Sequence, residues 1–202
     1  RVGFGYRALM DEVAALVCGL LGRPPAQTFS YGELFERHAG VDPLAAPDDA
    51  LWRRVAAAGI EPSPALRAAG RDAALDLLLT ALVEPAIAPL GAVFVTDYPA
   101  SQAALARLRP DRPALAERFE LYVDGMELAN GFTELIDAAE QRRRFEADNR
   151  TRQALGLVPV PLDEALLAAL EHGLPDCAGV ALGFDRLLML ACDIDDIAAL
   201  QV

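Results

Sequence analysis

The sequence predicts an α+β fold in which a mostly antiparallel sheet is flanked by helices. Residues 119–128 alternate around Asp124-Gly125, a dipeptide typical of a two-residue hairpin turn. Two more strands are expected at 92–96 and 178–182, where β-branched, aromatic and small apolar residues run together. Helical patterns fill the first half of the chain, so strands and helices do not alternate as they do in a doubly wound parallel sheet.

Length and composition fit one domain with a sizeable core. The chain has 202 residues, of which 53% are hydrophobic, and its apolar runs fall short of a membrane span. We expect residues 1–202 to form a single domain fragment, with 1–90 mainly helical and 91–202 carrying the sheet. The first residues, Arg1-Val2-Gly3-Phe4, include no initiator Met and no signal peptide and are typical of the middle of a protein.

Several segments have helical periodicity. Residues 8–21 place apolar side chains at helical spacing until Gly22, and Ser30 with Glu33 resembles a capping box. Further helices are expected around Leu51 to Val55, at 72–83, 137–155 and 163–173, and from near Asp185. Residues 1–90 carry no recognisable group of catalytic or ligand-binding side chains, so we interpret them as scaffold.

Charge and cysteine usage restrict the partners and the compartment. Eighteen basic and thirty acidic residues give a net charge of −12, whereas binding to a phosphate backbone needs clustered cations. The one dense cluster, Arg142 to Arg144, is interleaved with acids such as Glu140 and Glu146, which is typical of a solvated helix face. We expect neither tRNA nor a membrane as a partner. Three cysteines without metal or disulfide spacing indicate a cytoplasmic protein with reduced thiols.

The hairpin brings two carboxylates together. If Asp124 and Gly125 form the turn, the facing pairs are Val123 with Met126, Tyr122 with Glu127, and Leu121 with Leu128. Glu120 and Glu127 then become diagonal neighbours on one face of the sheet. Like charges so placed repel unless a cation lies between them, and paired carboxylates suit Mg²⁺. The alternative is a solvent-exposed acidic face, screened by water and Arg118.

The segment Gly179 to Leu187 combines a glycine-bracketed apolar strand with Asp185-Arg186 at a helix start. The helix dipole opposes an Arg in the first turn, so Arg186 is expected to meet an anion or a purine ring. Gly183 would let the backbone approach a nucleotide closely. The alternative is a capping Asp beside an Arg that pairs with a nearby carboxylate.

Glu127 to Glu134 forms a third candidate segment. Gly131 is expected to mark a bulge or bend that could aim Asn130 and Glu134 into a pocket. A carboxylate in a partly apolar pocket is a natural partner for a substrate ammonium.

Together these segments resemble a known family. Met126 to Leu135, with the pattern MELANGFTEL, resembles the amino-acid-binding strand of lysyl-tRNA synthetases, and Gly179 to Arg186 resembles motif 3 of class II synthetases. The similarity is closer to the elongation factor P–lysine ligases, paralogues that attach β-lysine to a lysine of elongation factor P. That closer match is carried by Pro99 to Ala103, Ala116 to Glu120, Glu140-Gln141, Arg144 to Glu146, Asp148-Asn149 and Gly173 to Gly183.

The resemblance implies a role for each site residue in a class II catalytic domain. Glu120 and Glu127 would hold ATP-bound Mg²⁺, and Leu128 and Gly183 would contact the nucleotide through their backbone. Asn130 and Glu134 would hold the substrate's amino group. Arg186 would pack on adenine near the phosphates as the catalytic cation. The implied reaction forms an acyl-adenylate, which an amine then attacks.

The resemblance also implies elements that this sequence lacks. Family members begin with motif 1, a dimer-interface element, and motif 2, which carries an Arg for the α-phosphate. A homodimer is therefore implied for a full-length protein, and little activity is expected of the 202-residue chain alone.

Three functions remain open at this point. The first is an ATP-dependent ligase that transfers lysine or β-lysine to elongation factor P. The second is a lysyl-tRNA synthetase catalytic domain, which the acidic charge and Ala181 disfavour, because the resemblance implies that those synthetases carry Gly there. The Ala181 methyl group is expected to narrow the substrate pocket beside Glu134 and so to discriminate between lysine isomers. The third is a non-catalytic, synthetase-like remnant.

Overall fold

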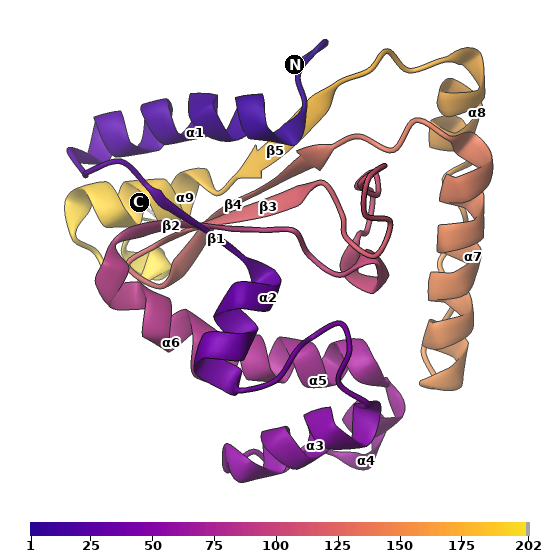
Figure 1. Ribbon diagram of the computed structural model, residues 1–202. Helices are drawn as coiled ribbons and strands as arrows, with labels where there is room; N and C mark the ends of the chain where they lie inside the picture. Colours follow the sequence, from indigo (N-terminus) through magenta and orange to yellow (C-terminus); the bar gives the residue numbers. More distant parts are fainter. Residues whose placement is uncertain (201–202) are drawn as a thin grey trace.

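A computed structural model describes residues 1–200 as a five-stranded sheet with helices on both faces (Figure 1). The strands follow chain order across the sheet: β1 (Gln27–Ser30), β2 (Ala92–Thr96), β3 (Arg118–Val123), β4 (Met126–Thr133) and β5 (Ala178–Leu182). The pairs β2–β3, β3–β4 and β4–β5 are antiparallel, and β1–β2 is parallel. The predicted α+β class with a mostly antiparallel sheet is confirmed.

Strand β1 is an addition to the sequence-based prediction, which interpreted residues 1–90 as mainly helical and named no strand there. Thr28 pairs with Phe94 and Phe29 with Val95, so the first half of the chain supplies one edge of the sheet. A four-residue run gives too little alternation to be distinguished from a loop, and its pairing partner lies more than sixty residues away.

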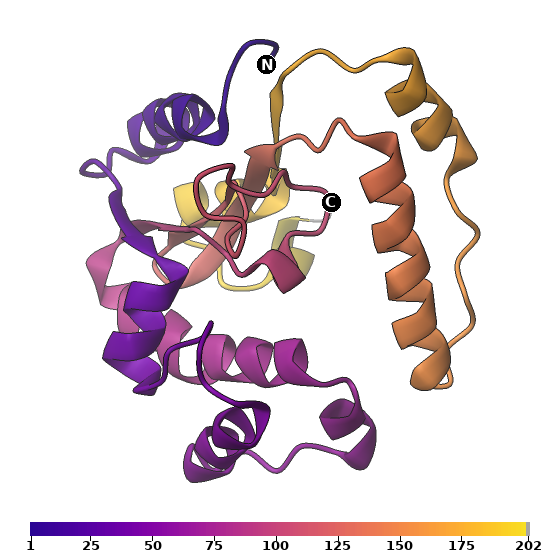
Figure 2. The same ribbon diagram turned by 45° about the vertical axis from the view of Figure 1, so that its right-hand side comes forward.

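The helices form two groups on opposite sides of the sheet and a separate pair beyond one end of the strands. Helices α1 (Tyr6–Leu21) and α9 (Phe184–Cys192) cover one face. On the other side lie α2 (Tyr31–Leu34), α5 (Arg71–Leu78) and α6 (Glu84–Ile87), and α3 (Asp48–Ala57) and α4 (Pro64–Ala68) pack against α5. Helices α7 (Ala138–Ala154) and α8 (Glu164–His172) run side by side, joined by an Arg142–Glu164 ion pair (Figures 1 and 2).

Each face of the sheet has its own hydrophobic core. Tyr122 belongs to the core under α2, α3, α5 and α6. Leu121, Val123 and Leu128 belong to the core under α1 and α9. Strand alternation therefore sends the two sets of β3 side chains to different cores, which fixes the register of the sheet.

The helical run from Arg71 to Leu90 is long and apolar enough to cross a membrane by length and composition, contrary to the expectation that no such run exists. In the structure its apolar side chains line the core: Leu75, Leu78, Val83 and Ile87 are fully buried. Because the core accounts for this apolar face, we interpret the run as a core element.

The hairpin is confirmed, with one correction to its register. Asp124 and Gly125 both have positive φ, and Tyr122 faces Glu127 as expected. Leu121, however, faces Ala129 and not Leu128, because a β-bulge shifts the register between Leu121 and Tyr122. The extra residue on β4 could not be deduced from alternation alone.

The expected irregularity at Gly131 is absent from that position. Gly131 pairs with Phe119 and Val180 in a continuous ladder. A Cβ on Gly131 would lie 2.5 Å from Cζ of Phe119, so this glycine makes room for the Phe119 ring. The change in side-chain direction that we expected at Gly131 is produced by the β-bulge.

Candidate active site

The bulge in β4 gathers the candidate side chains on one face of the sheet. Leu128 and Ala129 both enter the core under α1 and α9. Alternation then restarts, so Asn130 joins Glu127 on the opposite face, beside Glu120 of β3. Without the extra residue, Asn130 would share a face with Leu128.

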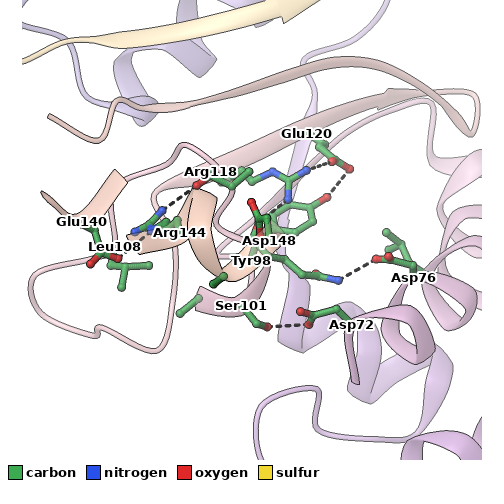
Figure 3. Close-up of a pocket in the computed structure, with 15 residues that line it drawn as sticks. Asp72, Asp76, Tyr98, Ser101, Leu108, Arg118, Glu120, Glu140, Arg144 and Asp148 are labelled. Atoms are coloured by element: carbon green, nitrogen blue, oxygen red, sulfur yellow. Dashed lines mark hydrogen bonds and ion pairs between the residues drawn. The ribbon is translucent and has the colours of Figure 1, made fainter. Parts of the chain in front are cut away.

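Glu120 lies at the centre of a hydrogen-bond network. Its Oε1 accepts from Arg118 Nη2 at 2.6 Å and from Asn130 Nδ2 at 3.1 Å. Its Oε2 accepts from the hydroxyls of Tyr98 at 2.5 Å and Tyr122 at 2.6 Å. The residue is 6% exposed, so the interpretation as a solvent-exposed acidic face is wrong for Glu120. Figure 3 shows Glu120 with Arg118 and Tyr98 at the cavity wall.

Glu127 differs from Glu120 in having a half-exposed carboxylate without such donors. Burial raises its pKa above the usual value, and the charge of Glu120 adds to this rise, whereas Arg186 and Arg118 lower it. Glu84 on α6 is a third carboxylate in this region. Burial raises its pKa too, and the charges of Glu120 and Glu127 contribute. The three acids therefore form an acidic region in which the carboxylate charges interact with one another.

Arg186 lies beside this acidic region. Its Nη1 donates to the backbone oxygen of Glu127 at 2.7 Å and lies 3.9 Å from Glu127 Oε2. The side chain is 50% exposed, so part of the guanidinium remains open to a ligand. The helix that carries it is capped by Gly183, and not by Asp185.

The backbone of Leu128 and Gly183 is joined directly. The Gly183 amide donates to the Leu128 carbonyl at 2.9 Å, and the Gly183 carbonyl accepts from the Leu187 amide. This bond connects the bulged part of β4 to the start of α9. It holds Arg186 against Glu127, although the two residues lie far apart in the sequence.

The substrate-binding candidates lie on β4 and next to β5. Asn130 faces Ala181 directly, and Phe132 faces Gly179. Gly179 is directly adjacent to Glu134, because a Cβ on this glycine would overlap the Glu134 carboxylate. Burial raises the pKa of Glu134. The neighbour of Glu134 on β5 is thus Gly179, whereas Ala181, expected beside Glu134, lies opposite Asn130.

Two cavities border the candidate face. One, of about 590 Å³, lies between α5, the start of β3 and α7, and its wall includes Asp72, Asp76, Arg118, Glu120 and Arg144 (Figure 3). The other, of about 550 Å³, is lined by Glu84, Met126, Glu127, Arg186, Met189, Asp195, Asp196 and Ile197. Both are of a size that accommodates small-molecule ligands.

Sequence analysis missed four residues of this site. Tyr98 and Tyr122 support Glu120, Glu84 adds a carboxylate, and Gly179 makes room for Glu134. Tyr122 shared the predicted face of Glu120, so its contact could have been found from the register. Tyr98 and Glu84 come from segments whose position depends on the tertiary fold.

Within residues 1–200, no group of three or more His, Cys, Asp or Glu side chains has a metal-binding arrangement. The three cysteines are free thiols. A metal at this site would therefore depend on ligands from a bound molecule.

Comparison with known proteins shows the family of this chain. The family model of class II tRNA synthetases (D, K and N) matches residues 77–202, which is more than half of the chain. The chain belongs to this class II synthetase family. The match includes every candidate site residue named from the sequence, from Glu120 to Arg186.

Curated relatives are similar to nearly the whole of this chain. A protein named elongation factor P–(R)-β-lysine ligase from Edwardsiella ictaluri is 54% identical over 186 residues, covering 92% of this chain and 57% of the relative. Proteins of the same name from Klebsiella pneumoniae subsp. pneumoniae and Vibrio cholerae are 50% and 48% identical, with 95% and 98% of this chain covered. The chain spans about three fifths of the length of these relatives.

Proposed function

We propose that this protein activates lysine or β-lysine with ATP as an acyl-adenylate and transfers it to a lysine of elongation factor P. Three relatives that are 48–54% identical to this chain carry the name of that activity. Membership of the class II synthetases supports the use of ATP. Because the chain covers about three fifths of those relatives, the proposal concerns the whole protein.

The proposal rests on one observation. Two groups suited to binding an amine, Asn130 and Glu134, lie next to a cavity of a size that suits a nucleotide. Asn130 and Glu134 both come from β4 or its immediate end, and Glu134 has a carboxylate of raised pKa beside Gly179. Glu127 and Arg186 line the neighbouring 550 Å³ cavity. An amino-acid ammonium and a nucleotide could thus lie side by side.

In the proposed reaction, the substrate carboxylate attacks the α-phosphorus of ATP, an oxygen–phosphorus bond forms and pyrophosphate leaves. A lysine amine then attacks the acyl carbon, an amide bond forms and AMP leaves. Glu134 and Asn130 would bind the substrate's amino group, and Arg186 would stabilise negative charge on the phosphates. Leu128 and Gly183 would approach the nucleotide through their backbone.

For Mg²⁺ to bind both Glu120 and Glu127, one of the hydrogen bonds to Glu120 must first break. Glu127 has free oxygens, and burial, followed by the charge of Glu120, raises its pKa, so a nearby cation would stabilise its charged form. Glu120 already accepts four hydrogen bonds, the full capacity of a carboxylate. We propose that Glu127 binds the nucleotide-associated Mg²⁺ first, and that Glu120 joins once one donor turns away. Mg²⁺ would supply charge neutralisation at the phosphates.

The substrate isomer and the partners belong to the same proposal. Ala181 opposite Asn130 would narrow the pocket and favour β-lysine over α-lysine. A net charge of −12 disfavours tRNA as the acceptor. We further propose a cytoplasmic location and a homodimer for the full-length protein.

Mass spectrometry of elongation factor P tests this function. Incubation with the full-length protein, ATP and (R)-β-lysine should add one lysyl group to a single lysine, and α-lysine should react less. Acylation of tRNA in place of elongation factor P would favour the lysyl-tRNA synthetase. Reaction with neither isomer would leave the non-catalytic remnant.

A further inference from the structure

Asn130 is held at both ends of its side-chain amide. Its Nδ2 donates to Glu120 Oε1 at 3.1 Å, and its Oδ1 accepts from Arg118 Nε at 3.3 Å. Arg118 also donates to Glu120 Oε1 and to the backbone oxygen of Gln102, at 2.7 Å. The orientation of the amide is therefore set by Arg118 and Glu120. One Asn130 N–H and one Oδ1 lone pair remain for a ligand.

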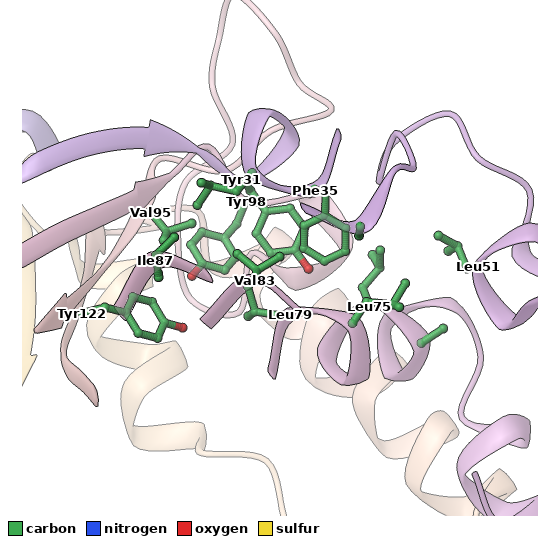
Figure 4. Packing of buried hydrophobic residues seen from close by; sticks show 14 of the residues in the cluster. Tyr31, Phe35, Leu51, Leu75, Leu79, Val83, Ile87, Val95, Tyr98 and Tyr122 are labelled. Atoms are coloured by element: carbon green, nitrogen blue, oxygen red, sulfur yellow. The ribbon is translucent and has the colours of Figure 1, made fainter. Parts of the chain in front are cut away.

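Glu120 is in turn held by two tyrosines. Tyr98 and Tyr122 donate to the same oxygen, Oε2, from different segments of the chain. Both rings are 2% exposed, and the Arg118 guanidinium lies 4.4 Å from the centroid of the Tyr98 ring. Figure 4 shows both rings packed in the core. With Oε2 fixed by the two hydroxyls, Oε1 can only face Arg118 and Asn130.

We propose that Tyr98 and Tyr122 are positioning residues that act through Glu120 to orient Asn130 toward the substrate amine. Together with Arg118 and Asn130, the two hydroxyls give Glu120 four hydrogen bonds that stabilise its buried charge. Without them, Glu120 can rotate and the Asn130 amide loses its fixed direction. The amide then binds an ammonium less well, because it must be ordered first. This inference rests on the proposed function only in its choice of ligand.

The chain offers a matched control for the tyrosines. Tyr31 is fully buried, and its ring centroid lies 4.9 Å from that of Tyr98 (Figure 4). Its hydroxyl has no hydrogen-bond partner in the described structure and does not touch Glu120. Tyr31→Phe therefore removes the same atom from the same core without affecting the Glu120 network.

Selective ¹⁵N labelling of asparagine provides a direct measurement. The 202-residue sequence has two asparagines, Asn130 and Asn149, and the Asn149 side chain on α7 pairs with the backbone of Val160. Without any substrate, the Asn130 side-chain amide proton that is bonded to Glu120 should exchange slowly with solvent in the wild-type protein. It should exchange much faster in the Tyr98→Phe/Tyr122→Phe variant. Asn149 in both proteins, and Asn130 in Tyr31→Phe, should be unchanged.

Calorimetric titration with lysine and β-lysine supplies the functional measurement. We expect the double variant to bind its preferred isomer roughly tenfold more weakly. The single Tyr→Phe variants should show smaller losses, which keeps the test possible if the double variant does not fold. A protected Asn130 proton in a folded double variant, or single variants that bind the amino acid as tightly as wild type, would overturn the proposal. Because the exchange measurement needs no substrate, it can succeed even if the proposed function fails.

Discussion

Gly179 shows how a single missing side chain shapes the amino-acid pocket. A Cβ at this position would overlap the Glu134 carboxylate but no backbone atom, so Gly179→Ala should displace Glu134 without disturbing the sheet. We expect the variant to fold with nearly unchanged thermal stability and to lose most of its affinity for the amino acid. Calorimetric titration together with thermal unfolding checks both. A variant that binds the amino acid normally would show that Glu134 does not bind the ammonium where the structure places it.

Two substitutions separate the binding of the amino acid from the choice between its isomers. Glu134→Ala leaves a substrate ammonium unpaired in a partly desolvated site, so amino-acid activation should nearly disappear while ATP still binds. Ala181→Gly should widen the pocket opposite Asn130 and shift preference from β-lysine toward α-lysine. Both effects are measured as kcat/KM for each isomer. Unchanged isomer preference in Ala181→Gly would show that Ala181 does not determine specificity.

Asp76 allows a test of the electrostatics in the larger cavity. Burial, followed by the charge of Asp72, raises the pKa of Asp76 above its usual value. For an acid with a raised folded-state pKa, the folded protein binds more protons than the unfolded chain, so this group's contribution to stability falls as pH rises through that pKa. Asp76→Asn should therefore stabilise the protein relative to wild type at pH 7, and this gain should shrink toward pH 4. Thermal midpoints across that range provide the check; a difference that does not vary with pH would contradict it.

Among the structural elements, the β3–β4 hairpin determines the geometry of the site. Its turn and first pairs could be predicted from Asp124-Gly125 and the alternation that flanks it. The bulge could not be predicted, because one extra residue leaves the local alternation of apolar and polar residues nearly unchanged. It becomes visible only when the structure shows which of the two cores each β4 side chain enters. The bulge is nevertheless what places Asn130 beside Glu120.

The close approach of β3 and β4 gives a stability prediction. Gly131→Ala would put a methyl group 2.5 Å from the Phe119 ring, which is fully buried, so overpacking should destabilise the protein by about 1–3 kcal/mol. Gly19 in α1 is the matched control, because nothing lies within 4 Å of the position that a Cβ would take there. Gly19→Ala should stabilise the protein by about 0.5–1 kcal/mol. Denaturant unfolding measures both, and equal effects of the two changes would contradict this account of Gly131.

At the scale of the whole molecule, the site joins both halves of the chain. Asp72 and Asp76 come from the helical half, while Arg118 and Glu120 come from the sheet, and all four line one cavity. Sequence analysis interpreted residues 1–90 as scaffold, because no motif within them carries chemistry by itself. Glu120, Glu127, Asn130 and Glu134 could be named from local patterns and from a family resemblance. Tyr98, which supports Glu120, and the nearby Glu84 could not, since only tertiary packing brings them to the sheet.

Amino-acid-dependent exchange between ATP and pyrophosphate, compared between the full-length wild-type protein and Glu127→Gln, tests the central claim most directly. The claim is that this face of the sheet forms an acyl-adenylate. We predict exchange that depends on β-lysine or lysine in the wild-type protein. In Glu127→Gln it should fall by at least about a hundredfold, with little change in the thermal midpoint, because the carboxylate is half-exposed and serves the nucleotide. Exchange that survives in Glu127→Gln, or its absence from the wild-type protein with both isomers, would contradict the account.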